Sequence, residues 1–101
     1  MCKLPKVVVV APEDKQLELR KQLSSLEYDI VATVAKAEDA IQIGCDVVII
    51  WEPDAETMSM LCEFEARTVA IGGAGEEAEM RIDPDDVASF KTRIWELFRP
   101  R

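Results

Sequence analysis

Short runs of β-branched residues alternate along this chain with segments that carry apolar residues at helical spacing. The first run, residues 6–10, is nearly all valine, which is typical of a strand buried on both faces. Further strands are expected at residues 28–34, 46–51, 68–71 and 80–82, and helices at 13–26, 36–43, 53–66 and 84–98. Such alternation predicts a parallel α/β sheet with helices on both faces.

The lengths of the connections refine this fold class. Five strands in 101 residues fit a flavodoxin-like, three-layer fold with strand order 2-1-3-4-5. Only residues 72–79 separate the fourth strand from the fifth, whereas a parallel crossover usually takes about a dozen residues or more. We therefore expect a mostly parallel sheet whose fourth helix is missing or reduced to a turn. The sequence leaves open whether the fifth strand pairs parallel or, through a long hairpin, antiparallel.

Composition limits the functions open to the chain. Twelve basic residues against twenty acidic ones give a net charge of −8, which argues against nucleic acid and anionic membrane surfaces as partners. The longest apolar run, residues 7–11, is far shorter than the roughly 20 residues of a membrane span, and no signal-peptide pattern is present. The absence of histidine excludes His-based catalysis and metal binding. We expect one cytoplasmic domain over residues 1–101.

The three cysteines are scattered and form no CxxC motif. They are too few for a disulfide framework, and reduced thiols fit a cytoplasmic protein. Cys45 and Cys62 are expected to be small core residues, and Cys2 precedes the first strand. No redox or phosphate-carrier chemistry is predicted.

One stretch of the chain resembles a known family. The residues Ala35-Lys36-Ala37-Glu38-Asp39-Ala40-Ile41, followed by Asp46-Val47-Val48-Ile49-Ile50, resemble the receiver domain of bacterial two-component response regulators. Receivers typically carry a small-acidic-Ala-Leu helix here, then a strand that ends in the phosphorylated aspartate. The leucine-striped first helix and the aromatic last helix also match, so the similarity extends over almost the whole chain.

The positions that carry receiver chemistry depart from the family pattern. Ala11 and Pro12 stand where receivers hold magnesium with two acids, and Trp51 stands at the phosphoacceptor aspartate. Gly72 or the glycine after it replaces a hydroxyl residue, and Asp83 replaces a lysine. Phosphoryl transfer to a carboxylate needs that nucleophile and fixed positive charge. The resemblance therefore implies an atypical receiver, or pseudo-receiver, that is not an enzyme and takes no cofactor.

The function that this resemblance implies is a phosphorylation-independent protein–protein interaction or signalling module. The partner would be an unidentified protein or a second copy of the chain, and atypical receivers occur, for example, at the N-terminus of ATPases that localise pilus-assembly machinery. Aromatic side chains are enriched at interface cores. The candidate contacts on the last helix are Phe90, Ile94, Trp95 and Phe98, with the helix that carries Leu19 and Leu23 as a second option.

An alternative function rests on acids near the same edge of the sheet. Glu13, Asp14 and Glu52 follow the first and third strands, and carboxylate oxygens are suitable ligands for a divalent cation. They would form a metal- or phosphate-responsive site. The competing explanation is that acids at helix N-termini interact favourably with the helix dipole.

Overall fold

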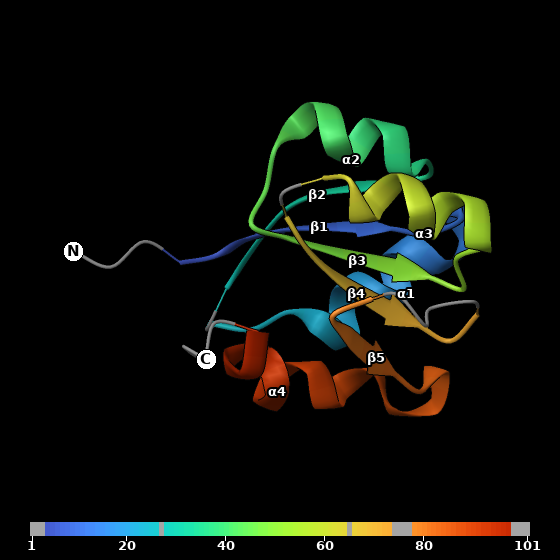
Figure 1. Cartoon of the computed structure of the whole chain (residues 1–101). Coiled ribbons are helices and arrows are strands. Elements are labelled where there is room, and N and C mark those ends of the chain that lie inside the picture. Colours follow the sequence, from blue (N-terminus) through green and yellow to red (C-terminus); the bar gives the residue numbers. More distant parts are fainter. Residues whose placement is uncertain (1–3, 27, 65, 74–77, 98–101) are drawn as a thin grey trace.

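A computed structural model describes residues 4–26, 28–64, 66–73 and 78–97 of the chain. Its elements, in chain order, are β1 (Lys6–Val10), α1 (Glu13–Leu23), β2 (Asp29–Val34), α2 (Ala37–Ile43), β3 (Val47–Trp51), α3 (Ala55–Cys62), β4 (Arg67–Ile71), β5 (Met80–Ile82), the 3-10 helix η1 (Pro84–Ser89) and α4 (Phe90–Leu97). The strands form one sheet in the order β2-β1-β3-β4-β5, and every pairing is parallel (Figure 1). The predicted α/β fold and strand order are confirmed, and β5 is parallel.

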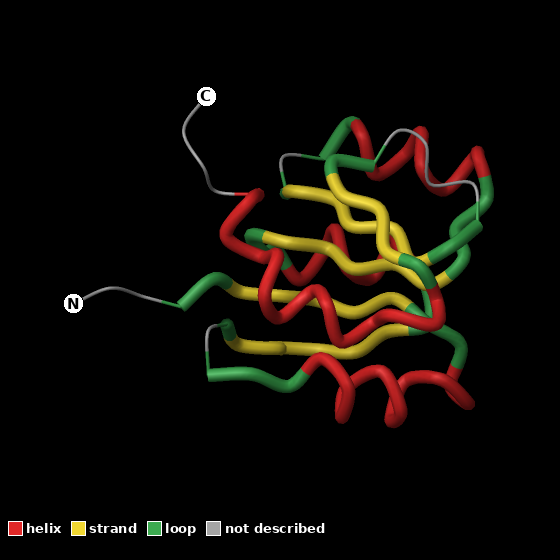
Figure 2. The backbone as a smooth tube through the Cα atoms, turned by 90° about the horizontal axis from the view of Figure 1, so that it is seen from below, coloured by secondary structure: helices red, strands yellow, loops and turns green. Residues whose placement is uncertain are grey.

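The fold has three layers. Helices α1 and α4 cover one face of the sheet, and α2 and α3 cover the other (Figures 1 and 2). The valines of β1 alternate between two cores: Val7 and Val9 pack on the α1/α4 side, Val8 and Val10 on the α2/α3 side. This two-sided burial explains the continuous valine run. Among the described residues, no helix has the length and apolarity that a membrane crossing requires.

The short connection between β4 and β5 contains no helix among its described residues, 72–73 and 78–79. A crossover this short suffices because β5 has three residues, and Val69 pairs with Met80 while Ile71 pairs with Ile82. The chain therefore returns along the sheet by only about two residues, roughly 7 Å. Ala78 packs on the α2/α3 side, so the connection passes over the face that a crossover helix would cover.

Two helices differ from their predicted extents. Helix α1 ends at Leu23, and Leu26, expected on its apolar stripe, is 94% exposed. The early end follows from Tyr28, whose buried hydroxyl donates a hydrogen bond to the Leu23 carbonyl. The predicted helix 84–98 starts instead as η1, and Asp86 has non-helical backbone angles (φ −132°, ψ 40°) before α4 begins.

Candidate functional site

The carboxyl ends of the central strands surround an open cavity of about 460 Å³. In open α/β sheets, ligands bind at this edge, beside the point where the strand order reverses. The loops after β1, β2 and β3 line the cavity. Ala11, Pro12 and Trp51 all lie on its wall, together with Lys36 and Glu52.

Trp51 forms the side of this cavity nearest α1. Its partly buried indole packs against the α1/α4 core, and the Lys15 ammonium lies 5.5 Å from the ring centroid. A cation over an indole face is an attractive arrangement. The last residue of β3 therefore joins the packing of α1 to the sheet and presents no carboxylate to the cavity.

The three candidate metal-binding acids are not brought together. Glu13 and Asp14 are exposed in the first turn of α1 and are absent from the cavity lining, whereas Glu52 lies on it. Across the described ranges, no group of three or more Asp, Glu, Cys or His side chains is arranged to hold a metal ion. This geometry favours the helix-dipole explanation for Glu13 and Asp14.

Another acid at the cavity, Asp54, caps helix α3. Its carboxylate accepts a hydrogen bond from the Thr57 backbone N–H at 2.7 Å. Hydrogen bonds from the Thr57 side chain and backbone hold the pKa of Asp54 below its ordinary value. The carboxylate is thus engaged with its own helix, which is the usual role of an aspartate at this position.

Asp54 gives a prediction for the pH dependence of stability. Its pKa is lower in the folded chain than in the unfolded one, so its contribution is fully present above the ordinary aspartate value. That contribution is lost as the pH falls through the lower, folded value. We expect Asp54→Ala to lower the thermal unfolding midpoint at neutral pH and to flatten its acid dependence.

The matched control for this prediction is Asp54→Asn, because asparagine caps helices as well as aspartate does but carries no charge. This variant should keep most of the neutral-pH stability and lose the acid dependence that Asp54 contributes. Calorimetric scans between neutral pH and about pH 3, close to the ordinary pKa of aspartate, provide the comparison. An unchanged acid dependence in both variants would contradict the prediction.

The loop after β4 approaches the loop after β3 closely. Gly72 and Gly73 have positive φ angles of 68° and 64°. A Cβ atom on Gly73 would lie 2.6 Å from the Glu52 carbonyl carbon, and one on Gly72 would lie 2.8 Å from Cγ of Pro84. Glu52 itself has φ 42°, in the left-handed region that non-glycine residues rarely adopt. The adjacent glycines carried the sequence signal for this tight contact, but the sequence indicated only a flexible turn.

Asp83, at the position of the receiver lysine, caps η1. Its carboxylate accepts a hydrogen bond from the Asp85 N–H at 3.1 Å, and Pro84 opens the helix, as the sequence indicated. The carboxylate therefore serves the local turn after β5.

The interaction candidates on α4 are corrected in part. Phe90 and Ile94 are fully buried in the α1/α4 core, so the prediction that they are surface contacts is wrong. Their spacing with Val87 and Leu97 forms the inward stripe of the helix, which explains the burial. Trp95 is 51% exposed, and Phe98 lies outside the described residues.

The second candidate helix, α1, shows the same pattern. Leu19 and Leu23 are buried and do not reach the surface, whereas Leu17 on the opposite side is 65% exposed.

The two described cysteines, Cys45 and Cys62, differ in their surroundings. Burial, with a smaller contribution from Asp46, raises the pKa of Cys45 to about 11, so its thiol stays protonated at neutral pH. Cys45 packs against the α2/α3 core as expected. Cys62 is exposed, so its predicted core position is wrong, and Cys2 lies outside the described residues.

Comparisons with known proteins found no matching family model, no matching curated protein and no matching solved structure. Without such a match, the function of this chain is inferred from the geometry of its residues.

Proposed function

We propose that this chain is a receiver-like protein-interaction module that acts without phosphorylation and without catalysis. The observation that carries the proposal is the set of side chains at the carboxyl edge of a 2-1-3-4-5 sheet: Ala11, Pro12, Trp51, Gly72 and Asp83. Phosphorylation at this edge would require a carboxylate nucleophile, a divalent cation and a fixed positive charge. None of these five residues supplies a nucleophile after β3 or a cation after β5.

The packing of these residues supports the same proposal. Trp51 holds α1 through the core and Lys15, Asp83 caps η1, and Gly73 fits against the Glu52–Pro53 backbone. Trp51 and Asp83 therefore have structural roles that account for their presence at this edge without phosphorylation. Cys45 and Cys62 are free thiols, and free thiols persist in reducing compartments, so the cytoplasm is the location that this proposal includes.

A second candidate function is supported by the open cavity itself. The cavity is lined by Lys36, Glu38 and Glu52, whose charged side chains could bind a small charged ligand. This would be the metal- or phosphate-responsive domain suggested by Glu13, Asp14 and Glu52. The separation of Glu13 and Asp14 from the cavity makes it the weaker candidate.

An amide NMR titration separates the two candidates. We expect Mg²⁺, and then beryllofluoride as a phosphoryl mimic, to cause no saturable shifts at residues 11–14 and 51–54. The matched control is Glu52→Gln, because shifts that persist in this variant come from weak binding to a surface of net charge −8. Saturable shifts at the cavity that Glu52→Gln abolishes would refute the pseudo-receiver proposal and support the acid site.

A further inference from the structure

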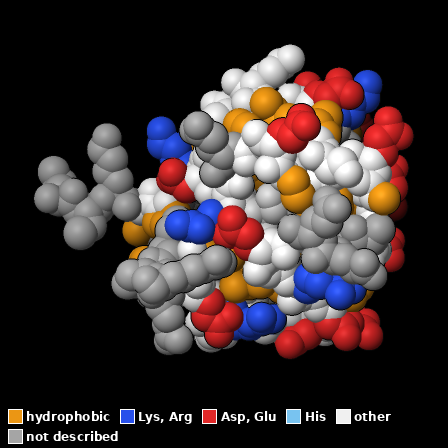
Figure 3. Space-filling view, viewed as in Figure 1, with side chains coloured by type: hydrophobic (Ala, Val, Ile, Leu, Met, Phe, Trp, Pro, Cys, Tyr) orange, Lys and Arg blue, Asp and Glu red, His pale blue; other side chains and the backbone are white. Residues whose placement is uncertain are grey.

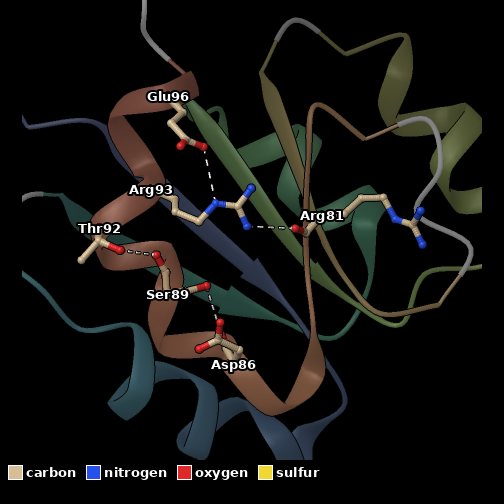
Figure 4. A network of polar contacts seen from close by, with 6 residues as sticks. All are labelled: Arg81, Asp86, Ser89, Thr92, Arg93 and Glu96. Atoms are coloured by element: carbon tan, nitrogen blue, oxygen red, sulfur yellow. Dashed lines mark hydrogen bonds and ion pairs between the residues drawn. The ribbon is translucent and has the colours of Figure 1, made fainter.

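The two edges of the sheet differ in how they are protected. Strand β5 has three residues, and Pro84 follows it closely. The Ile82 carbonyl accepts from the Gly72 N–H on β4's side, so the neighbouring Arg81 carbonyl faces the outer edge. The Arg93 guanidinium donates to that carbonyl at 3.3 Å and also to Glu96 at 3.4 Å (Figure 4). Short strands and groups that cover the backbone block pairing at an edge.

Strand β2 forms the opposite edge and carries no such protection. It has six residues, without charge or proline from Ile30 to Val34, and Val31 is 40% exposed. In the described part of the chain, no element pairs with its outer side (Figure 2). The Val34 carbonyl accepts from the Ala11 N–H, so it faces β1. By the alternation of a strand, the Thr33 N–H and C=O point outward, available to another strand.

The broad face of the molecule is less suited to a partner. On the face shown in Figure 3, acidic and basic side chains are interspersed, and the hydrophobic side chains lie in small separate areas. Large contiguous apolar patches are the usual sign of an interface. The backbone of the β2 edge is the more specific surface.

We propose that the β2 edge pairs antiparallel with the β2 edge of a second copy of this chain, about a twofold axis at Thr33. This inference deepens the proposed function, and rests on it, by naming a surface for the interaction. A twofold interface uses the same surface on both copies. Facing residues of an antiparallel pair either exchange two backbone hydrogen bonds or point their backbone groups away from each other. An axis through the outward-facing Thr33 gives the first arrangement, in which Thr33 and its copy exchange two hydrogen bonds.

Charge complementarity supports a second copy as the occupant. The register of β2 against β1 shifts between Val7 and Val8, so β2 contains one extra residue, a β-bulge. With Thr33 at the axis, this bulge places Asp29 opposite Lys36 of the second copy. The twofold axis repeats the contact, which gives two ion pairs.

Asp29 and Lys36 lie at the two ends of the β2 edge. Strand β2 ends at Val34 and the chain bends at residues 35 and 36. Lys36 itself has extended backbone angles (φ −125°, ψ 140°), which pairing up to this residue requires. Asp29 and Lys36 are both exposed, and neither takes part in the ion pairs found among the described residues.

The helices beside the edge also accommodate a second copy. Both α1 and α2 contact β1 and β2, so each lies over the gap between these strands. Adjacent strands are about 4.8 Å apart, so the twofold axis would place equivalent helices of the two copies roughly 10 Å apart. This equals the usual spacing of packed helices, about 8–10 Å. All three layers would therefore continue across the interface, although the charge of −8 on each copy opposes association.

A charge-reversal experiment tests the pairing and its register. Sedimentation velocity over a concentration series, at physiological salt, should show a reversible dimer. Asp29→Lys alone and Lys36→Asp alone should each weaken dimerisation roughly tenfold or more, because both ion pairs become like-charge contacts. An equimolar mixture of the two variants should dimerise like the original chain, because both contacts in the mixed dimer join opposite charges. Glu63→Lys, an exposed change of the same charge at the end of α3, is the control and should leave dimerisation within about twofold.

A second variant tests the backbone pairing. Thr33→Pro removes an outward N–H and keeps the hydrogen bonds to β1, so it should give a folded monomer by circular dichroism and sedimentation. Amide exchange at Thr33 in the unaltered chain should slow as concentration rises. A chain that stays monomeric, or a dimer that survives both Thr33→Pro and the charge reversals, would overturn the edge pairing. The Mg²⁺ and beryllofluoride titration tests the cavity independently of dimerisation. If the titration causes no saturable shifts and the chain is monomeric, the edge pairing is refuted and the pseudo-receiver proposal is not.

Discussion

Phe90→Ala is expected to lower the free energy of unfolding by about 3–5 kcal/mol, the usual cost of emptying a buried aromatic site. The Phe90 side chain is fully buried between α4, α1 and the sheet. Its ring lies edge-on to Tyr28, with centroids 5.1 Å apart and planes at 67°. The substitution therefore removes the largest side chain that is fully buried among the described residues, together with a favourable aromatic pair.

The control for this prediction is Trp95→Ala, on the same helix. Half of the Trp95 side chain is exposed, so its loss should cost about 1 kcal/mol or less. Urea unfolding followed by far-ultraviolet circular dichroism measures both variants. Equal losses would mean that α4 packs on the sheet through a different face. A small loss at Phe90 would contradict the assignment of this residue to the core.

The sequence predicted the sheet because burial on two faces leaves a clear pattern. Strand β1 is valine at every position from Val7 to Val10, and β3 is apolar at every position from Val47 to Ile50. Both strands are central in the sheet. Strand order followed from the flavodoxin-like class. The direction of β5 was not predictable, because an eight-residue connection fits either pairing until the short length of the strand is known.

Helix ends and surface roles were predicted less well. The apolar spacing in α4 correctly indicated an inward stripe at Val87, Phe90, Ile94 and Leu97, and assigning Phe90 and Ile94 to an interface contradicted that stripe. Leu26 continued the spacing of α1, but the packing of Tyr28 ends the helix at Leu23. Such endings depend on tertiary contacts that local spacing does not record.

The candidate site was also predicted only in part. The ends of the strands placed Ala11, Pro12 and Trp51 at one edge, because parallel strands bring their carboxyl ends together. The close approach of Gly73 to Glu52 joins loops that are distant in sequence, and the pattern of neither loop indicates it. Glu13 and Asp14 do not reach the cavity, because the direction of α1 points its first turn elsewhere. The sequence does not indicate this helix direction.

Gly73→Ala is expected to destabilise the fold by about 2–5 kcal/mol, the sum of a left-handed backbone penalty and overpacking. The new Cβ would lie 2.6–2.8 Å from the Glu52 and Pro53 backbone, which has no flexible side-chain end to move aside. Gly44→Ala is the matched control, because Gly44 also has a positive φ (77°) but nothing within 4 Å of its Cβ position. It should cost only the backbone penalty, about 1–3 kcal/mol, because its backbone (φ 77°, ψ 128°) lies in a region that glycine alone adopts readily. Chemical unfolding of both variants gives the comparison.

The location of the disturbance provides a second test of the same substitution. Because the Gly73 loop presses on the Glu52–Pro53 segment, Gly73→Ala should shift the amide resonances of residues 51–54 and widen the cavity edge, whereas Gly44→Ala should leave them unchanged. Equal stability losses, or shifts confined to the β4–β5 connection, would show that the two loops do not support each other. If the shifts occur as expected, the approach of Gly73 to the β3–α3 backbone helps to shape this edge of the sheet.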